Sequence, residues 1–466
     1  MGVNARDWSR RRPFAVTVRL PLDAANDGQL HRRHYVPVWL KFALALSVSL
    51  AWATLAYMVA HPWVSELEGS GRRLFAHLLI IGLVVTPAFM NAFIAVGLLL
   101  DRRPARSRFA DGDFPGVTIL IAARNAQETI LGTLASVAMQ RYPAPIEVMV
   151  ISDGSSDATL ERLRGVSYPW LEVIDLKCSG GKAKALNAGL RLASYPITVT
   201  LDADAHLHPQ ALRRLVTRYM SDPPGTAAVA GAVLVRNSRQ SLVARMQEWD
   251  YFQNIAATRR VQSLCQGMLA ASGTFSLYRT DILRVVGGWP ECAGEDTVLT
   301  WAILRDHHRV GYAEDAIAFA RVPPTLTQFL AQRRQWSQGV VEALRAHGAL
   351  LFRRKLSTFF IWWSLLFPYT DLVYTIALLP ALLLACWGVY WLAAALLAFV
   401  LPMALLAHGV AYATQSRMFH ELGLTVRRNP FGLLGYALVY GLVLKPASVT
   451  GYLAGLVARR SNHYPS

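Results

Sequence analysis

The sequence predicts an α/β domain with a mainly parallel sheet, joined to an α-helical domain that crosses a membrane several times. Hydrophobic residues make up 53% of the chain and charged residues only 17%, less charge than a soluble protein of this size usually carries. Five apolar stretches are long enough to cross a bilayer, which takes about 20 helical residues. Between the second and the third, β-branched runs alternate with helical patterns, which is typical of a parallel sheet.

These patterns divide the chain into six segments. We expect a basic cytosolic arm at 1–35, two transmembrane helices at 36–100, a cytosolic α/β domain at 113–336, an interfacial amphipathic helix at 337–357, about three transmembrane helices at 358–457 and a tail at 458–466. A turn is expected at 386–388. Lys445 and Pro446 interrupt the last apolar stretch, which predicts a break or a re-entrant segment there.

The formal net charge of +17 narrows the classes of partner. Basic residues flank the apolar stretches at the N-terminal arm, at 102–108 and at 417–428, which predicts that these loops face the cytosol from the cytoplasmic (inner) membrane. No nucleic-acid partner is expected, because no base-reading module accompanies the charge. The expected partners are a lipid bilayer and a phosphate-bearing small molecule. The four cysteines are scattered without metal-ligand spacing, and we interpret them as reduced thiols.

Three strands are expected in the α/β domain, at 117–121, 148–151 and 197–201, each followed by a polar cluster. Helices are expected at 129–139, 160–164 and 183–192. Ligands of parallel sheets bind at the carboxyl ends of the strands. The polar clusters are therefore the candidate functional residues.

Asp202 and Asp204 follow the third strand with one residue between them. Alternate residues that leave a strand point the same way, so both carboxylates can hold one cation. Hard oxygen ligands favour Mg²⁺ or Mn²⁺, which also bind phosphate oxygens. A solvated turn is an equally good interpretation of this pair alone. His206 and His208 follow, and we interpret them as loop residues rather than as metal ligands.

Two further clusters suit a nucleotide. Asp153 ends the second strand, where its carboxylate can accept hydrogen bonds from a base or ribose, although a plain turn and helix cap also fit the sequence. Gly180 and Gly181 let the backbone approach a ligand, and Lys182 adds a charge for phosphate.

A second acidic pair, Glu295 and Asp296, lies about ninety residues beyond the first. One carboxylate there can act as a general base towards a hydroxyl. A single base opposite a metal-held leaving group predicts direct displacement with inversion. In isolation, such a pair is more often a solvated turn.

The segment 332–336 reads Gln-Arg-Arg-Gln-Trp. Arginine binds a diphosphate through its two-pronged guanidinium, and Trp336 offers a flat apolar surface for a sugar ring.

Together, the ordered motifs resemble the family 2 inverting glycosyltransferases of the membrane-bound polysaccharide synthase type, and most closely the poly-N-acetylglucosamine synthases. Hyaluronan, chitin and cellulose synthases are more distant relatives. The motifs cover about 117–347: Ala122-Ala123-Arg124-Asn125, Ser152-Asp153-Gly154-Ser155, Gly181-Lys182-Ala183-Lys184, Asp202-Ala203-Asp204, Ser272-Gly273 with Gly287-Gly288-Trp289, Gly294-Glu295-Asp296, and Gln332 to Trp336 with Ser337-Gln338-Gly339 after it.

The resemblance implies a GT-A-type nucleotide-sugar domain, a UDP-sugar donor and Mg²⁺ or Mn²⁺. It implies that the donor site is made by Ala122, Arg124, Asn125, Asp153, Lys182, Asp202, Gln332, Arg333 and Arg334, with Asp202 and Asp204 at the metal. It also implies that Asp296, with Glu295 beside it, is catalytic, and that Ser272, Gly273 and Trp336 bind the acceptor.

The sequence departs from the family pattern in two places. The family motif is Gln-x-x-Arg-Trp, and here Gln335 replaces its arginine. Either Arg333 or Arg334 must supply that charge, or the diphosphate is held less tightly. Arg124 stands where the family often has tyrosine and Ala126 where it often has glutamate, so the resemblance specifies the base and sugar less firmly.

Polar residues also fall inside the apolar stretches: Asn91, Asp371, His408 and Lys445. Such residues usually face a bundle interior or an aqueous path. Asp371 is a candidate to line the path of a growing glycan, and pairing between helices is an equally good explanation.

Three functions remain open from the sequence. The first is a processive synthase that extends a β-linked polymer of hexose or N-acetylhexosamine and helps to move it outward. The second is a transferase that adds one sugar to a lipid acceptor. The third is a non-catalytic partner in a secretion complex. Family analogy adds regulation by cyclic di-GMP or by a small membrane subunit as an expectation.

Overall fold

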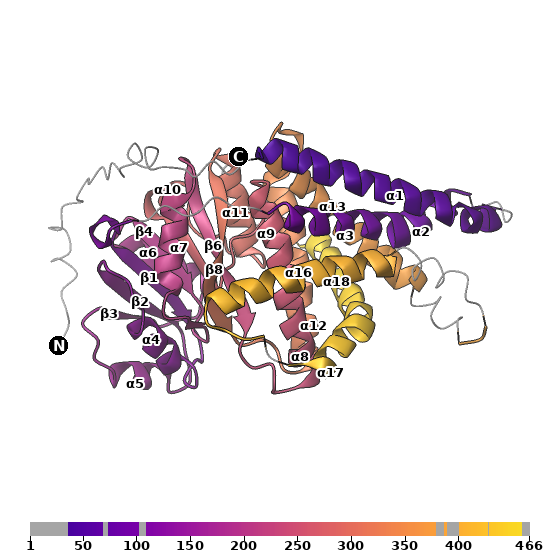
Figure 1. The fold of residues 1–466 in the computed structure, drawn as a ribbon. Helices are drawn as coiled ribbons and strands as arrows, with labels where there is room; N and C mark the ends of the chain where they lie inside the picture. The colour runs from indigo at the N-terminus through magenta and orange to yellow at the C-terminus, as the bar shows by residue number, and fades with distance from the viewer. Residues whose placement is uncertain are drawn as a thin grey trace. The chain divides into compact units, whose positions relative to one another are not determined.

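The computed structural model describes residues 36–68, 73–101, 109–378, 386–388, 400–426 and 428–458. In this part of the chain, eight strands form one sheet in the order β3-β2-β1-β4-β7-β6-β8-β5 (Figure 1). The strands are β1 (Val117–Ala123), β2 (Ile146–Asp153), β3 (Leu171–Leu176), β4 (Ile197–Leu201), β5 (His206–Leu207), β6 (Thr226–Val235), β7 (Phe275–Arg279) and β8 (Arg309–Ala320).

The first half of the sheet is parallel, as the alternating pattern predicts. β1 pairs in parallel with both β2 and β4, and β2 with β3. The crossovers carry helices α4 (Ile130–Ala138), α5 (Thr159–Arg164) and α6 (Lys182–Leu192), close to the expected ranges. β7 is antiparallel to β4 and β6, so the sheet is mixed where the chain returns from its helices.

The strands form because their apolar residues can be buried on both faces. β4 and β6 are buried along their whole length, which is characteristic of a sheet covered by helices on either side. Ile119 packs in the core that contains α4 and α7 (Ala211–Ser221). Its neighbour Leu120 packs in the opposite core, with α6 and α11 (Glu295–Arg305).

Helix α12 (Leu326–His347) begins at Thr325, whose side chain accepts a hydrogen bond from the amide of Gln328. The expected boundary after Trp336 therefore lies inside one continuous helix. The expected interfacial segment at 337–357 forms the second half of this helix, a 3-10 helix (η6, Gly348–Phe352) and the start of α13 (Leu356–Val373).

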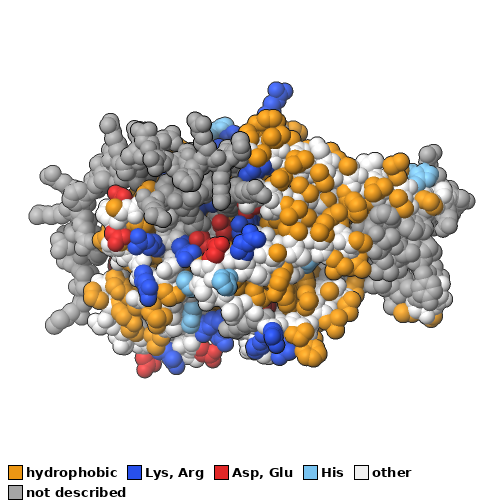
Figure 2. Space-filling view, in the orientation of Figure 1, with side chains coloured by type: hydrophobic (Ala, Val, Ile, Leu, Met, Phe, Trp, Pro, Cys, Tyr) orange, Lys and Arg blue, Asp and Glu red, His pale blue; other side chains and the backbone are white. Residues whose placement is uncertain are grey.

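The helical part also contains α1 (Val38–Glu68), α2 (Arg73–Ile80), α3 (Thr86–Leu99), α16 (Leu401–Glu421), α17 (Pro430–Gly435) and α18 (Gly441–Val457). Three stretches of the described residues are long and apolar enough to cross a membrane: Val38–Pro62, Leu74–Leu99 and Pro430–Val457. Figure 2 shows hydrophobic side chains over the long helices, while acidic and basic side chains gather mostly over the α/β part of that face.

The expected turn at 386–388 is confirmed. The fourth expected membrane stretch, from the turn to about residue 413, lies partly outside the described residues, which resume at 400. The break predicted at Lys445 and Pro446 is wrong, because α18 runs through both residues. A proline removes one helical hydrogen bond, and here packing against α12 and α13 keeps the helix continuous. Lys445 also contacts Asp371 of α13, with 2.8 Å between Nζ and Oδ1.

Candidate active site

Two loops at the carboxyl edge of the sheet hold each other in place. Asn125, after β1, has a positive φ of 50°, a conformation that asparagine tolerates better than most residues. Its side-chain oxygen accepts a hydrogen bond from the backbone amide of Ser156 at 2.9 Å. Its own backbone amide donates to the hydroxyl of Ser155 at 3.2 Å. These contacts fix the backbone beside Arg124, which is exposed.

Asp153 organises the loop before α6. Its carboxylate accepts hydrogen bonds from the amide of Gly180 at 2.7 Å, from the amide of Gly181 at 3.0 Å and from the hydroxyl of Ser179 at 3.0 Å. Gly181 has a φ of 89°, which only glycine adopts readily. The loop therefore presents Lys182, the first residue of α6, towards the end of β4.

Lys182 lies at the centre of the site. Its Nζ donates to Oδ1 of Asp202 at 2.5 Å and to the carbonyl of Gly273 at 3.3 Å. Burial acts to lower the pKa of Lys182, but the negative charges of Asp202, Glu295 and Asp296 outweigh it and raise the pKa. The lysine is therefore protonated at neutral pH.

The second acidic pair reaches the same network. The amide of Gly273 donates to Oδ2 of Asp296 at 3.4 Å, while Oδ1 accepts from the amide of Thr297 at 2.7 Å. Burial, followed by repulsion from Asp296, raises the pKa of Glu295 to about 7. The structure thus brings Lys182, Asp202, Gly273, Glu295 and Asp296 together from four separate motifs.

Asp204 lies beside this network and lines a cavity together with Lys182. Burial and the nearby Asp202 raise its pKa to about 6. Two neighbouring, half-buried carboxylates fit a divalent cation whose other ligands come from a phosphate. Within the described ranges, no group of three or more acidic, histidine or cysteine residues could hold a metal alone.

A cavity of about 470 Å³ opens beside Asp204. Its walls come from the loop after β1, from Asp153, from the start of α6, from the end of β4 and from the residue after β8. The lining residues are Ala122, Ala123, Arg124, Asn125, Ala126, Thr129, Asp153, Gly181, Lys182, Ala203, Asp204 and Arg321. Five of the residues expected at the nucleotide, Ala122, Arg124, Asn125, Asp153 and Lys182, therefore line one cavity.

The residues of 332–336 lie on α12 and point in different directions. Arg333 is only 5% exposed, and its guanidinium lies 3.1 Å from the carboxylate of Asp250. Tyr440 donates to the same carboxylate at 2.8 Å. The indole of Trp336 stacks on the guanidinium of Arg333, 4.2 Å from its central carbon, and remains 43% exposed. The buried guanidinium of Arg333 thus packs against the inner face of the Trp336 indole and holds it in position.

The other residues of the segment lie elsewhere. Arg334 and Gln335 are exposed, and the amide of Gln335 donates to the carbonyl of Ala293 at 3.3 Å. Gln332 is half-buried, and its Oε1 accepts no hydrogen bond from the described residues. None of these three is among the described residues that line the 470 Å³ cavity.

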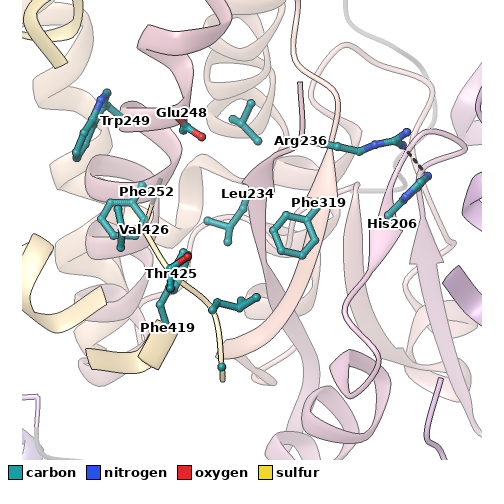
Figure 3. Close-up of a pocket in the computed structure, with 13 residues that line it drawn as sticks. His206, Leu234, Arg236, Glu248, Trp249, Phe252, Phe319, Phe419, Thr425 and Val426 are labelled. Atoms are coloured by element: carbon teal, nitrogen blue, oxygen red, sulfur yellow. Dashed lines mark hydrogen bonds between the residues drawn. The ribbon is translucent and has the colours of Figure 1, made fainter. Parts of the chain in front are cut away.

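A second cavity of about 440 Å³ lies between the sheet and the end of α16. Figure 3 shows its mainly apolar lining, which includes Trp249, Phe252, Phe319 and Phe419. Arg236 turns towards His206, and 2.6 Å separates Nη1 from Nε2. This pairing fixes Arg236 beside the histidine.

Sequence reasoning missed Asp250 and Arg321. Asp250 begins a π-helical turn (η5, Asp250–Ile255) inside a helix, where no motif marks it. Arg321 directly follows β8, a mostly apolar strand that the sequence analysis did not identify. Applying the strand-end rule to 309–320 could have found it.

The family model described as "Glycosyltransferase like family 2" matches residues 115–339. A poly-β-1,6-N-acetyl-D-glucosamine synthase of Staphylococcus epidermidis is 30% identical over 290 residues, 60% of this chain and 70% of that protein. The synthase of the same name from Staphylococcus aureus is 31% identical over 272 residues, 56% of this chain and 65% of its own length.

Among solved structures, the chain is similar to the mannosyltransferase PcManGT of Pyrobaculum calidifontis in complex with GDP-Man and Mn²⁺. The TM-score is 0.53 at 19% identity, with 89% of this chain and 99% of that chain covered. At this identity the likeness concerns the fold alone, which is the GT-A glycosyltransferase fold with its mainly parallel sheet. The sequence match to the synthases and the family model agree with it, and the chain belongs to glycosyltransferase family 2.

Proposed function

We propose that this chain is a processive inverting glycosyltransferase that polymerises a UDP-sugar into a β-linked exopolysaccharide and assists its passage across the membrane. The observation that carries the proposal is the network of Lys182, Asp202, Gly273 and Asp296, which reaches a nucleotide-sized cavity through Lys182. The names of the two relatives support N-acetylglucosamine as the sugar.

The donor would occupy the 470 Å³ cavity, with its base towards Arg124 and Asn125 and its diphosphate towards Asp204. Asp202 and Asp204 are the residues that would hold Mg²⁺ or Mn²⁺, and the ion would neutralise charge on the departing diphosphate. Lys182 holds Asp202 in place through its 2.5 Å contact and keeps a positive charge beside the reacting centre.

The acceptor sugar would stack on Trp336 with its hydroxyl towards Asp296. Asp296 takes the hydroxyl proton as the oxygen attacks the anomeric carbon, and the bond from that carbon to the diphosphate breaks on the opposite face. The configuration inverts because one displacement occurs. Glu295, whose pKa is raised to about 7, is the neighbour of Asp296 in the sequence. Both carboxylates interact with the positive charge of Lys182.

The helices are the basis for proposing processivity and translocation. Stretches that are long and apolar enough to span a membrane flank the α/β domain in sequence, and α12 packs along α18. Glycines of α18 make this packing close: a Cβ on Gly455 would stand 2.8 Å from Cβ of Val341. The same helices support a multi-pass position in the cytoplasmic membrane, with the catalytic domain in the cytosol. Asp371 belongs to this proposal as a residue of the glycan path.

A panel of radiolabelled UDP-sugars with the full chain in lipid nanodiscs, with Mg²⁺ or Mn²⁺, tests the function. We expect a ladder of long glycans that a β-linkage-specific hydrolase digests, and at least a hundredfold loss of product with Asp296→Asn. One sugar on an extractable lipid would establish the single-transfer alternative. UDP release that survives Asp296→Asn would remove Asp296 as the base. No turnover with any donor would favour the non-catalytic alternative, and adding cyclic di-GMP or a co-expressed small subunit tests regulation.

A further inference from the structure

The diphosphate that leaves the donor needs cations around it, because its charge increases as the bond to the sugar breaks. The arginines of α12 do not supply them from where they lie. Arg333 is buried against Asp250, and Arg334 is not among the described residues lining the donor cavity. Gln335, where the family has arginine, carries no charge and binds the carbonyl of Ala293.

Three cationic residues line the cavity in the described part of the chain: Arg124, Lys182 and Arg321. Lys182 already binds Asp202 and the carbonyl of Gly273. Arg124 belongs to the loop after β1, next to Asn125. Arg321 follows the end of β8 and lines the same cavity as Asp204, the carboxylate that would face the metal and the phosphates.

Arg321 is held loosely in a way that suits a ligand. Its Nη1 lies 3.6 Å from the carboxylate of Glu128, and their side chains are 38% and 76% exposed. Exposed pairs of this kind contribute little free energy, so the guanidinium can leave Glu128 at small cost.

The surroundings of Arg321 include a second arginine, Arg236, as well as the carboxylates of Glu128 and Asp204. Arg236 lies near it, because the amide of Arg236 donates to the carbonyl of Ala320 at 2.8 Å, and burial and then Arg321 lower the pKa of Arg236. The contact with His206 holds Arg236 in place (Figure 3). Arg236 therefore does not move away from the like charge of Arg321. Arg321 also acts to lower the pKa of Asp204, against the effect of burial.

We propose that Arg321 binds the β-phosphate of the nucleotide donor's diphosphate and supplies the positive charge that Gln335 leaves absent from α12. The inference rests on the proposed function, because it takes the 470 Å³ cavity as the donor site. The guanidinium gives two parallel hydrogen bonds to phosphate oxygens from the β8 side, opposite Lys182. In this chain, a residue directly after β8 would thus take the role that the family's arginine has in the segment 332–336.

Equilibrium binding of UDP and of UMP to the full chain in nanodiscs, with Mg²⁺ present, tests this inference. Arg321→Gln should weaken UDP binding about tenfold, the effect of losing charge-assisted hydrogen bonds, and change UMP binding less than twofold. Arg321→Lys keeps the charge without the fork and should fall between Arg321→Gln and the parent. Arg191→Gln is the matched control, because this exposed residue of α6 removes one positive charge away from the cavity.

The outcomes separate the inference from the function on which it rests. A parent protein that binds neither UDP nor UMP would overturn the proposed donor. A parent that binds UDP, with Arg321→Gln no weaker than Arg191→Gln, would overturn the role of Arg321 alone. An equal loss of UDP and UMP would also overturn it, because that result assigns Arg321 to the base, the ribose or the α-phosphate. If Arg321→Gln fails to fold, Arg321→Lys is compared with Arg191→Gln in the same assay.

Discussion

Gly294 and Gly339 lie back to back where the loop before α11 meets α12. A Cβ placed on Gly339 would stand 2.6 Å from Cα of Gly294, closer than real side-chain carbons approach. The carboxylate of Glu342, one turn along α12, accepts a hydrogen bond from the amide of Gly294 at 3.1 Å. This contact sets the distance between the acidic pair after Gly294 and Trp336 before Gly339.

Gly339→Ala should therefore push α12 away from the acidic pair and lower kcat at least tenfold, since small displacements of a catalytic group are costly. Steady-state turnover measures the effect. Gly348→Ala is the control, because a Cβ there meets no atom within 4 Å. Equal turnover in the two variants would show that the glycine contact does not position the catalytic pair.

Lys182→Gln should lower kcat by roughly two orders of magnitude, because it removes a preorganised positive charge beside Asp202, Glu295 and Asp296. Lys184→Gln, on the same helix, removes only an exposed contact to Glu291 at 3.3 Å and should leave turnover within twofold. The measurement is kcat and KM for the nucleotide sugar. A defect confined to KM would contradict a role for Lys182 at the reacting centre.

The parallel half of the fold and the network at its edge were predictable from the sequence for a physical reason. Buried parallel strands are apolar along their length, and their carboxyl ends must meet at one edge. Asp153 and Asp202 stand at the ends of two such runs, so the strand-end rule places both at this edge, whereas Lys182 follows β3, a partly exposed strand that the sequence did not predict. The strand-end rule gives no side-chain partners, and the structure alone shows that Asp153 binds the loop before α6.

Asp250→Asn should lower the free energy of unfolding by about 3 to 5 kcal/mol, because it leaves Arg333 buried without its counter-charge. Denaturation in mild detergent measures the change. Asp281→Asn, at the more exposed pair with Arg279, should cost less than about 1 kcal/mol. The double variant Asp250→Leu with Arg333→Leu should recover part of the loss, and a strictly additive result would contradict direct pairing.

Asp250 and Arg333 also show why part of the site could not be predicted. The two residues are far apart in sequence, and each is unremarkable locally, so nothing indicates that they pair. The sequence suggested Arg333 as a diphosphate ligand because arginine and tryptophan share one segment. Arg333 and Trp336 are one helical turn apart on the same side of α12, where Arg333 is buried against the core and the indole of Trp336 lies over it and stays partly exposed.

His347, the last residue of α12, should make stability depend on pH. Burial, with a smaller effect of Arg305, lowers its pKa to about 4 from an ordinary value near 6.5. The folded state thus disfavours the protonated ring, so stability is complete above about pH 6.5 and falls as the pH drops towards 4. Thermal unfolding midpoints at pH 7.5 and 5.0 measure this, and His347→Gln should lose less on acidification. An equal drop in both proteins would assign the pH dependence to other groups.

Asp371 and Lys445 distinguish a structural pair from a glycan path. The carboxylate of Asp371 binds Nζ of Lys445 at 2.8 Å and the hydroxyl of Tyr452 at 3.1 Å, across α13 and α18. Asp371→Ala alone leaves the half-buried ammonium of Lys445 without its carboxylate and should destabilise the protein, whatever else Asp371 does. The double variant Asp371→Leu with Lys445→Leu removes both charges and should restore much of the stability.

Polymer length and export in sealed vesicles then test the path itself. If Asp371 lines it, the restored double variant should still make shorter chains, because an apolar wall replaces a polar one that a hydrated glycan contacts. Normal length and export in this variant would assign Asp371 to helix pairing alone. The outcome is interpretable because the double variant separates the loss of a charge pair from the loss of a polar surface, which Asp371→Ala cannot do.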